Sequence, residues 1–182
     1  MRIIHYRSLP NLISLGRLIL VPAIISMIAD QRWREACILF VIAGISDAID
    51  GWIAKTFDWR SELGSYLDPL ADKALIDSIY VSLAIVGVIP ATIAILVVAR
   101  DLMIVGAFMI SVVLRKPVKV RPLMISKLNT LAQLGFAALV LGVKAFGLPS
   151  GPWFDGLLYC VAVLTLASTA AYMLQWIRHM NL

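Results

Sequence analysis

Apolar residues fall into six long segments along the chain, separated by short polar or Gly/Pro-containing connections. Two uncharged runs, 78–99 and 156–177, are each long enough to cross a bilayer, which takes about 20 helical residues. Gly87 and Pro90 interrupt the first run and mark a break between two helices. The pattern therefore predicts six membrane-spanning helices, at Leu12–Ala29, Glu35–Lys55, Gly64–Val88, Ala91–Leu114, Ile125–Phe146 and Trp153–Ile177.

The composition agrees with an all-α membrane protein. Hydrophobic residues make up 61% of the chain and charged residues 15%, whereas soluble chains average about 45–50% and about 25%. The length of 182 residues predicts a single transmembrane domain over 1–182, with a short interfacial segment at 1–10. It excludes a large transporter with two internal halves.

Basic residues give the expected orientation. With six spans, ten of them lie on the side of the two termini and three on the other side. The ten are Arg2, Arg7, Lys55, Arg60, Arg115, Lys116, Lys119, Arg121, Lys127 and Arg178, and the three are Arg32, Arg34 and Lys144. The positive-inside rule then places both termini in the cytoplasm. The net charge of +5 is thus explained by membrane topology and gives no reason to expect nucleic acid as a partner.

Six of the eleven acidic residues lie inside the predicted spans and beyond the first three residues of each, where an aspartate costs about 2.5–3.5 kcal/mol at a helix centre. Four of them form two pairs, Asp47 with Asp50 and Asp68 with Asp72, and their spacing places each pair on one helix face. Because the two helices are antiparallel neighbours, the four carboxylates are expected to meet at one depth. Their repulsion requires a cation, and oxygen ligands favour magnesium or manganese.

Small residues surround the two acidic pairs: Gly44, Gly51, Ala54 and Gly64. Such residues let helices or a ligand approach closely. A small cation carrier is an alternative from a different functional class. A carrier is expected to spread its charges over the full bilayer depth, whereas the four acids here gather near the cytoplasmic side.

Two further pairs of charged residues have simpler interpretations. Lys73 and Asp77 are four positions apart, which predicts a salt bridge along one helix face. Arg100 and Asp101 are neighbours that point about 100° apart on a helix of 3.6 residues per turn. Each of these two is therefore expected to meet a different partner.

The acidic pairs belong to a longer pattern, which runs Asp47-x2-Asp50-Gly51-x2-Ala54-Lys55-x8-Gly64-x3-Asp68-x3-Asp72. This pattern resembles the signature of the CDP-alcohol phosphatidyltransferase family, D-x2-D-G-x2-A-R-x8-G-x3-D-x3-D. Every spacing fits, and seven of the eight fixed residues are identical. The departure is Lys55 in place of arginine, which keeps the charge but loses the bidentate fork for phosphate.

The resemblance implies a fold and a reaction. A phosphatidyl group would pass from CDP-diacylglycerol to the hydroxyl of an alcohol, with CMP as the leaving group. The four signature aspartates would hold two divalent cations, magnesium or manganese, and Asp72 would also be the general base. The CDP part of the donor would contact Gly51, Ala54, Lys55 and Gly64. The resemblance also implies a homodimer in a bacterial cytoplasmic membrane, with the active site facing the cytoplasm.

The acceptor is suggested by three further segments, which resemble the branch of the CMP-forming cardiolipin synthases: 63–73, Arg100-Asp101 and 125–130. This resemblance favours phosphatidylglycerol as the acceptor. The bacterial phosphatidylglycerophosphate synthases resemble the same segments, more often with Arg-Glu at the second, so glycerol 3-phosphate stays open as the alternative.

Three basic residues are candidates for binding the acceptor's phosphate: Arg100, Lys127 and, less strongly, Arg17. Their positive charges lie in or next to the predicted spans, where such groups need a partner. For Arg100, an ion pair with a signature aspartate is the open alternative.

Overall fold

The computed structural model describes residues 9–56, 62–113 and 123–180, and the regular structure in these ranges is entirely α-helical. The helices are α2 (Leu9–Ala29), α3 (Trp33–Thr56), α4 (Glu62–Ile85), α5 (Ala91–Val113), α6 (Met124–Phe146) and α7 (Pro152–Met180). Each begins and ends within three residues of a predicted span. The predicted number and order of helices are therefore confirmed.

The predicted interfacial segment at 1–10 is described only at its last two residues. Residues 1–8 lie outside the described ranges, but Leu9 and Pro10 already belong to α2. A proline is tolerated in the first turn of a helix because the amide proton that it lacks would have no partner there. The interfacial position of the segment at 1–10 stays a prediction.

Three of the helices end in the same type of turn, with one residue in the left-handed region. This residue is Gly87 after α4, Gly147 after α6 and Gln31 after α2. After α4, the amide of Val88 donates to the carbonyl of Leu83 at 2.9 Å, which closes the helix end. The break that Gly87 and Pro90 predict between two helices is thus confirmed.

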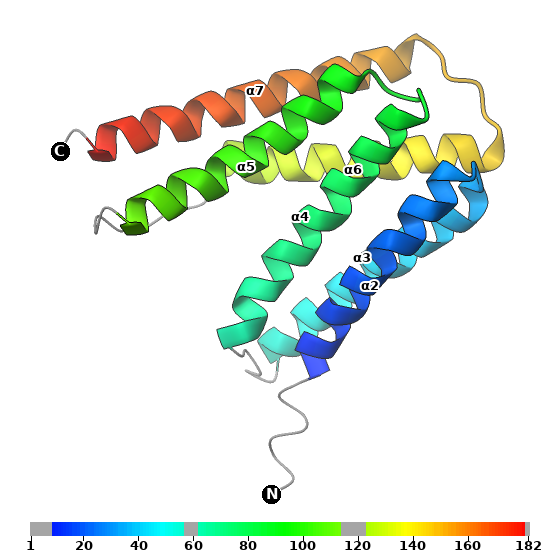
Figure 1. Ribbon diagram of the computed structural model, residues 1–182. Helices are drawn as coiled ribbons and strands as arrows, with labels where there is room; N and C mark the ends of the chain where they lie inside the picture. The colour runs from blue at the N-terminus through cyan, green and yellow to red at the C-terminus, as the bar shows by residue number, and fades with distance from the viewer. Residues whose placement is uncertain (1–8, 57–61, 114–122, 181–182) are drawn as a thin grey trace, which may run out of the picture.

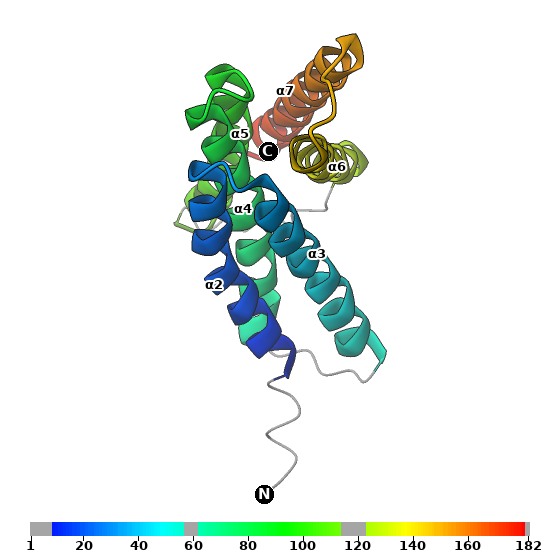
Figure 2. The same cartoon turned by 90° about the vertical axis from the view of Figure 1, so that its right-hand side faces the viewer.

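Helix α4 is the centre of the arrangement. It packs against α2 on one side and against α5 and α6 on the other, while α3 contacts α2 and α6, and α7 contacts α5 and α6. Figures 1 and 2 show α2, α3 and α4 running side by side, with α5, α6 and α7 tilted against them. The fully buried core side chains come from both groups: Ile24, Ile28, Ile79, Tyr80, Leu83, Val97, Val140 and Leu141.

Large aliphatic side chains also cover the outside of the molecule. Each helix contributes at least one that is more than half exposed: Ile19, Ile38, Ile85, Ile95, Leu131 and Val163. Soluble proteins rarely expose apolar surface on this scale. Two of the described helices, at Met124–Phe146 and Pro152–Arg178, are long and apolar enough to cross a membrane.

Candidate active site

Three helices meet at one buried arginine. Arg17 on α2 is 1% exposed, and its Nη1 atom lies 2.7 Å from Oδ1 of Asp47 on α3. The same nitrogen contacts Oδ1 of Asp72 on α4. The side chains of Asp47 and Asp72 are 48% and 43% exposed, so each carboxylate keeps an accessible side.

The three side chains lie at a similar depth because α3 runs antiparallel to α2 and α4 (Figure 1). At 1.5 Å per residue, Arg17 is about 12 Å from the start of α2 and Asp47 about 14 Å from the end of α3. Asp72 is about 15 Å from the start of α4. The predicted convergence of carboxylates from two helices is confirmed for Asp47 and Asp72.

The other signature residues are only partly described. The side chains of Asp50, Asp68, Ala54, Lys55 and Gly64 lie outside the described part of the structure. Their backbone positions belong to α3 and α4. Uninterrupted helices therefore carry both acidic pairs at the spacings that the sequence shows, and the roles of these five residues stay predictions.

Two glycines near the acidic pairs face open space. A Cβ atom added at Gly44 or at Gly51 would meet nothing within 4 Å. Close packing of helices is therefore not the reason for a small residue at either position in the described structure. The remaining expectation, room for a ligand, fits Gly51, which lies one position after the signature acid Asp50.

The carboxylates present suit a hard divalent cation. Asp47 and Asp72 direct one oxygen each at a single positively charged atom, which is how two carboxylates share a bound ion. Only these two of the four signature acids have described side chains. Among all described residues, no three or more acidic, histidine or cysteine side chains come together as a metal-binding group. The observed convergence therefore fits the cations that the family resemblance implies.

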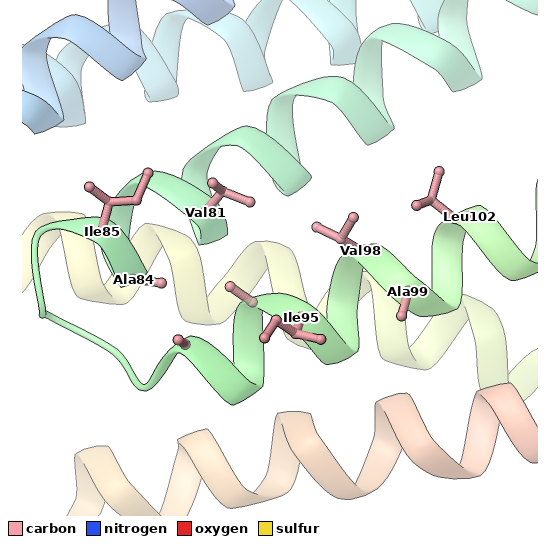
Figure 3. Close-up of a pocket in the computed structure, with 9 residues that line it drawn as sticks. Val81, Ala84, Ile85, Ile95, Val98, Ala99 and Leu102 are labelled. Carbon is pink, nitrogen blue, oxygen red and sulfur yellow. The ribbon is translucent and has the colours of Figure 1, made fainter.

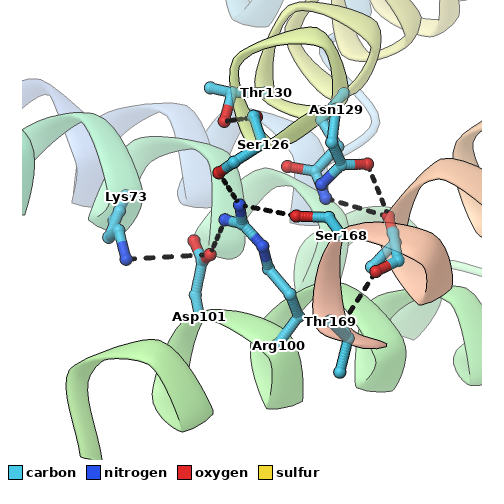
Figure 4. Close-up of polar contacts among 10 residues, drawn as sticks. Lys73, Arg100, Asp101, Ser126, Asn129, Thr130, Ser168 and Thr169 are labelled. Carbon is cyan, nitrogen blue, oxygen red and sulfur yellow. Dashed lines mark hydrogen bonds and ion pairs between the residues drawn. The ribbon is translucent and has the colours of Figure 1, made fainter. Parts of the chain in front are cut away.

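A second polar cluster surrounds Arg100 (Figure 4). Arg100 on α5 is 4% exposed and contacts both the carboxylate of Asp101 and the hydroxyl of Ser126 on α6. It also donates to Oγ of Ser168 on α7 at 3.2 Å. Lys73 on α4 completes the cluster, with its Nζ 3.7 Å from Oδ1 of Asp101. One arginine therefore ties α5, α6 and α7 together, and Asp101 joins them to α4.

The expectation of a salt bridge between Lys73 and Asp77 is wrong. The expectation that Arg100 and Asp101 meet different partners is confirmed in part, because the two serines contact only Arg100 and Lys73 pairs only with Asp101, but the two residues also contact each other. Arg100 and Asp101 contact each other, because an arginine side chain is long enough to fold back onto the next residue. Lys73 pairs with Asp101, and no ion pair joins it to Asp77 although both side chains are described. A contact four residues apart on a helix contributes only about 0.2–0.5 kcal/mol, so a buried carboxylate on the neighbouring helix prevails. Oδ1 of Asp77 is buried without a hydrogen-bond partner.

Three buried polar residues form a network between α6 and α7 that the sequence pattern did not predict. Gln133 donates to Oγ1 of Thr165 at 3.2 Å, and Thr165 donates to Oδ1 of Asn129 at 3.0 Å. All three are at most 1% exposed. Their signal in the sequence is a helical spacing of polar side chains within apolar helices, which is typical of contacts between membrane helices.

The three acceptor candidates have different surroundings. Arg17 contacts two signature acids, and Arg100 is enclosed by Asp101 and two serines. Lys127, in the first turn of α6, is exposed. No ion pair or hydrogen bond of its side chain is found within the described residues. Lys127 is thus the candidate whose charge is most accessible to a ligand.

An apolar groove of about 490 Å³ lies between α4 and α5 (Figure 3). It runs from Val81 and Ile85 on α4 to Ile95 and Leu102 on α5, and all of its lining side chains are aliphatic. No side chain in it can hold a cation or move a proton. The predicted catalytic and metal-binding residues therefore lie outside this groove.

Comparisons with known proteins agree with the motif. The family model described as CDP-alcohol phosphatidyltransferase matches residues 7–176, a range that includes all eight signature positions. The CMP-forming cardiolipin synthase of Rattus norvegicus is 32% identical over 181 residues, 91% of this chain and 60% of the relative.

Relatives named as glycerol-3-phosphate 3-phosphatidyltransferases are about as similar to this chain as the rat relative is. The chloroplastic CDP-diacylglycerol–glycerol-3-phosphate 3-phosphatidyltransferase 1 of Oryza sativa is 34% identical over 188 residues, 92% of this chain and 56% of the relative. The CDP-diacylglycerol–glycerol-3-phosphate 3-phosphatidyltransferase of Bacillus subtilis is 30% identical over 181 residues, 91% of this chain and 93% of the relative.

The chain thus spans about 60% of the length of the rat relative and nearly the whole of the Bacillus relative. The family model covers most of the chain, and the signature spacing is complete between Asp47 and Asp72. These matches show that the chain belongs to the CDP-alcohol phosphatidyltransferase family.

Proposed function

We propose that the chain is an integral membrane enzyme that transfers a phosphatidyl group from CDP-diacylglycerol to the hydroxyl of a glycerol-type acceptor and releases CMP. The observation that carries the proposal is the contact of Asp47 and Asp72 with one cationic nitrogen. It brings two signature carboxylates from different helices within reach of a single cation, as metal-assisted phosphoryl transfer requires.

Asp72 takes the proton of the acceptor in this reaction. The acceptor oxygen forms a bond to the phosphorus that carries the diacylglycerol, and the bond from this phosphorus to the bridging oxygen breaks. The electron pair leaves with CMP, and the hydroxyl proton passes to the carboxylate of Asp72. The side chain of Asp72 is 43% exposed, so an acceptor hydroxyl can reach it.

Two divalent cations, magnesium or manganese, would stabilise the charge that develops on the entering and leaving oxygens. The residues that would hold them are Asp47, Asp50, Asp68 and Asp72. The donor's CDP part would contact Gly51, Ala54, Lys55 and Gly64, as the match to the family signature suggests.

All six helices would cross the bilayer, with both termini in the cytoplasm of a bacterium. The helices are 21–29 residues long, or about 31–43 Å, which is enough for a hydrocarbon core of about 30 Å. Their exposed aliphatic side chains and the distribution of basic residues support this topology. Family membership suggests that two copies form a homodimer.

Phosphatidylglycerol is the acceptor that we favour, which would make cardiolipin the product. The name of the rat relative and the three segments at 63–73, Arg100-Asp101 and 125–130 support it. The names of the rice and Bacillus relatives favour glycerol 3-phosphate as the second candidate. The difference in identity between these relatives is too small to decide.

A paired assay distinguishes the two acceptors. Purified protein is incubated with CDP-diacylglycerol and Mg²⁺, and either phosphatidylglycerol or glycerol 3-phosphate is added. We expect CMP and cardiolipin with phosphatidylglycerol, and little CMP with glycerol 3-phosphate. Product from glycerol 3-phosphate alone would reject the cardiolipin assignment and keep the phosphatidyl transfer.

Lys55→Arg tests the position where this chain departs from the family signature. Arginine restores the residue of the signature and adds a second hydrogen bond to phosphate. We therefore expect kcat to be retained and KM for CDP-diacylglycerol to be equal or lower, as measured by CMP release. A severe loss of activity would mean that Lys55 has a role specific to this chain.

A further inference from the structure

Arg17 places a positive charge between two signature carboxylates. Its Nη1 atom lies between Oδ1 of Asp47 and Oδ1 of Asp72 and contacts both. The guanidinium is buried, and each carboxylate comes from a different helix. A cation held by the same two carboxylates would compete with this nitrogen for them.

Two carboxylates that contact the same nitrogen atom need a positive charge between them. Without one, their repulsion would drive them apart or favour the protonated form of one of them. Arg17 supplies such a charge from within the chain. A divalent cation at the same oxygens would stand against a buried guanidinium, and two positive charges in contact repel each other strongly.

We infer that Arg17 is an internal counter-cation, which holds Asp47 and Asp72 together in the metal-free protein and is displaced when a divalent cation binds them. This inference rests on the metal site of the proposed function. It adds that Arg17 competes with the divalent cation for the two carboxylates. The displaced guanidinium stays beside the site, where an anionic phosphate is a suitable partner for it. Arg17 is then a positioning residue that affects metal binding from inside the site.

The second polar cluster does not offer the same competition. Arg100 and Lys73 both direct their charge at Asp101 and not at either of the two described signature acids. Asp101 is 6% exposed, so its ion pairs are part of the buried interior. Among the described side chains, the contacts with Asp47 and Asp72 thus single out Arg17 as the cation that metal must replace.

The test compares Arg17→Gln with Arg32→Gln in detergent micelles. Arg32 pairs with Glu35 at 3.0 Å on the exposed surface of the opposite end of α3, so this control removes the same charge away from the site. Mn²⁺ binding is measured by electron paramagnetic resonance, and Tm is measured without metal and with saturating Mn²⁺.

We expect Arg17→Gln to lower the Mn²⁺ Kd by about tenfold, within the 5–150-fold range that is usual for linked binding equilibria. Its Tm without metal should lie below that of the unchanged protein, and saturating Mn²⁺ should remove most of this difference. The reason is that no arginine contacts the two acids in either metal-bound protein: it is displaced in the unchanged protein and absent from the variant. Arg32→Gln should behave like the unchanged protein throughout.

Arg17→Lys keeps the test informative if Arg17→Gln does not fold. A lysine ammonium keeps the charge but lacks the planar fork, so its Mn²⁺ Kd should fall between those of the unchanged protein and of Arg17→Gln. Unchanged or weaker Mn²⁺ binding in these variants would overturn the inference, as would a Tm deficit that Mn²⁺ leaves unaltered. If CMP release by the unchanged protein persists in that case, the proposed function stands and only the role of Arg17 is rejected.

Discussion

Asp72→Asn is expected to lower kcat for CMP release by about 10²–10⁴-fold, the usual contribution of a general base. Asparagine keeps the shape of the side chain and can still accept a hydrogen bond from Arg17, but it cannot take the proton of the acceptor. Binding of CDP-diacylglycerol should therefore persist. The measurement combines steady-state CMP release with direct titration of the donor onto the purified variant.

Asp77→Asn is the matched control for this change. It makes the same substitution on the same helix five residues later, at a carboxyl group outside the signature whose Oδ1 has no hydrogen-bond partner. Its kcat should stay close to that of the unchanged protein. Full turnover by Asp72→Asn would show that another group takes the proton.

Arg100→Met has the largest expected effect on stability. The change leaves Asp101, which is 6% exposed, without the arginine that contacts it, and it deprives Ser168 of a donor. Removal of one partner of a buried ion pair typically lowers the free energy of unfolding by about 3–5 kcal/mol. Denaturant unfolding in detergent micelles, followed by tryptophan fluorescence, measures the loss.

Two further variants separate a lost ion pair from a general effect of the substitution. Arg178→Met removes an exposed arginine from α7 and should change the free energy of unfolding by no more than about 0.5 kcal/mol. Arg100→Met combined with Asp101→Leu removes both charges and should recover part of the loss. A single variant Arg100→Met as stable as the unchanged protein would contradict a structural role for this cluster.

The same residue allows a test of the acceptor assignment. Arg100→Lys keeps the charge next to Asp101, so much of the stability should remain. If Arg100 serves only to join α5, α6 and α7, the KM for the acceptor stays unchanged in this variant. A raised KM with normal stability would instead support a contact between Arg100 and the acceptor's phosphate.

The helices were predictable because apolar length and turn chemistry are local properties. A span of about 20 apolar residues and the Gly87–Pro90 break suffice to place helix ends within three residues. The acidic site was predictable for a related reason. The spacing within each pair fixes one helix face, and a short connection makes α4 antiparallel to α3, so Asp47 and Asp72 were expected at one depth. The prediction that α3 and α4 are direct neighbours is wrong, because α2 is the helix that packs against both of them.

The partners of the buried charges depend on how each helix is rotated against its neighbours, which the sequence does not state. Lys73 meets Asp101 on α5 and not Asp77 on its own helix, because the interface with α5 brings the buried carboxylate closer. The ion pairs of Arg17 with both signature acids were not predicted either, because they depend on how α2 is rotated against α3 and α4. The hydrogen bond between Gln133 and Thr165 was not predicted because it depends on how α6 packs against α7.

The most direct test of the central claim is CMP release from CDP-diacylglycerol by the purified protein in the presence of phosphatidylglycerol. We predict that CMP forms with Mg²⁺ or Mn²⁺, that a chelator stops its release, and that Asp72→Asn lowers its rate about 10²–10⁴-fold under the same conditions. Cation flux into liposomes without any CMP, under conditions in which the protein is folded, would contradict the account and support a carrier.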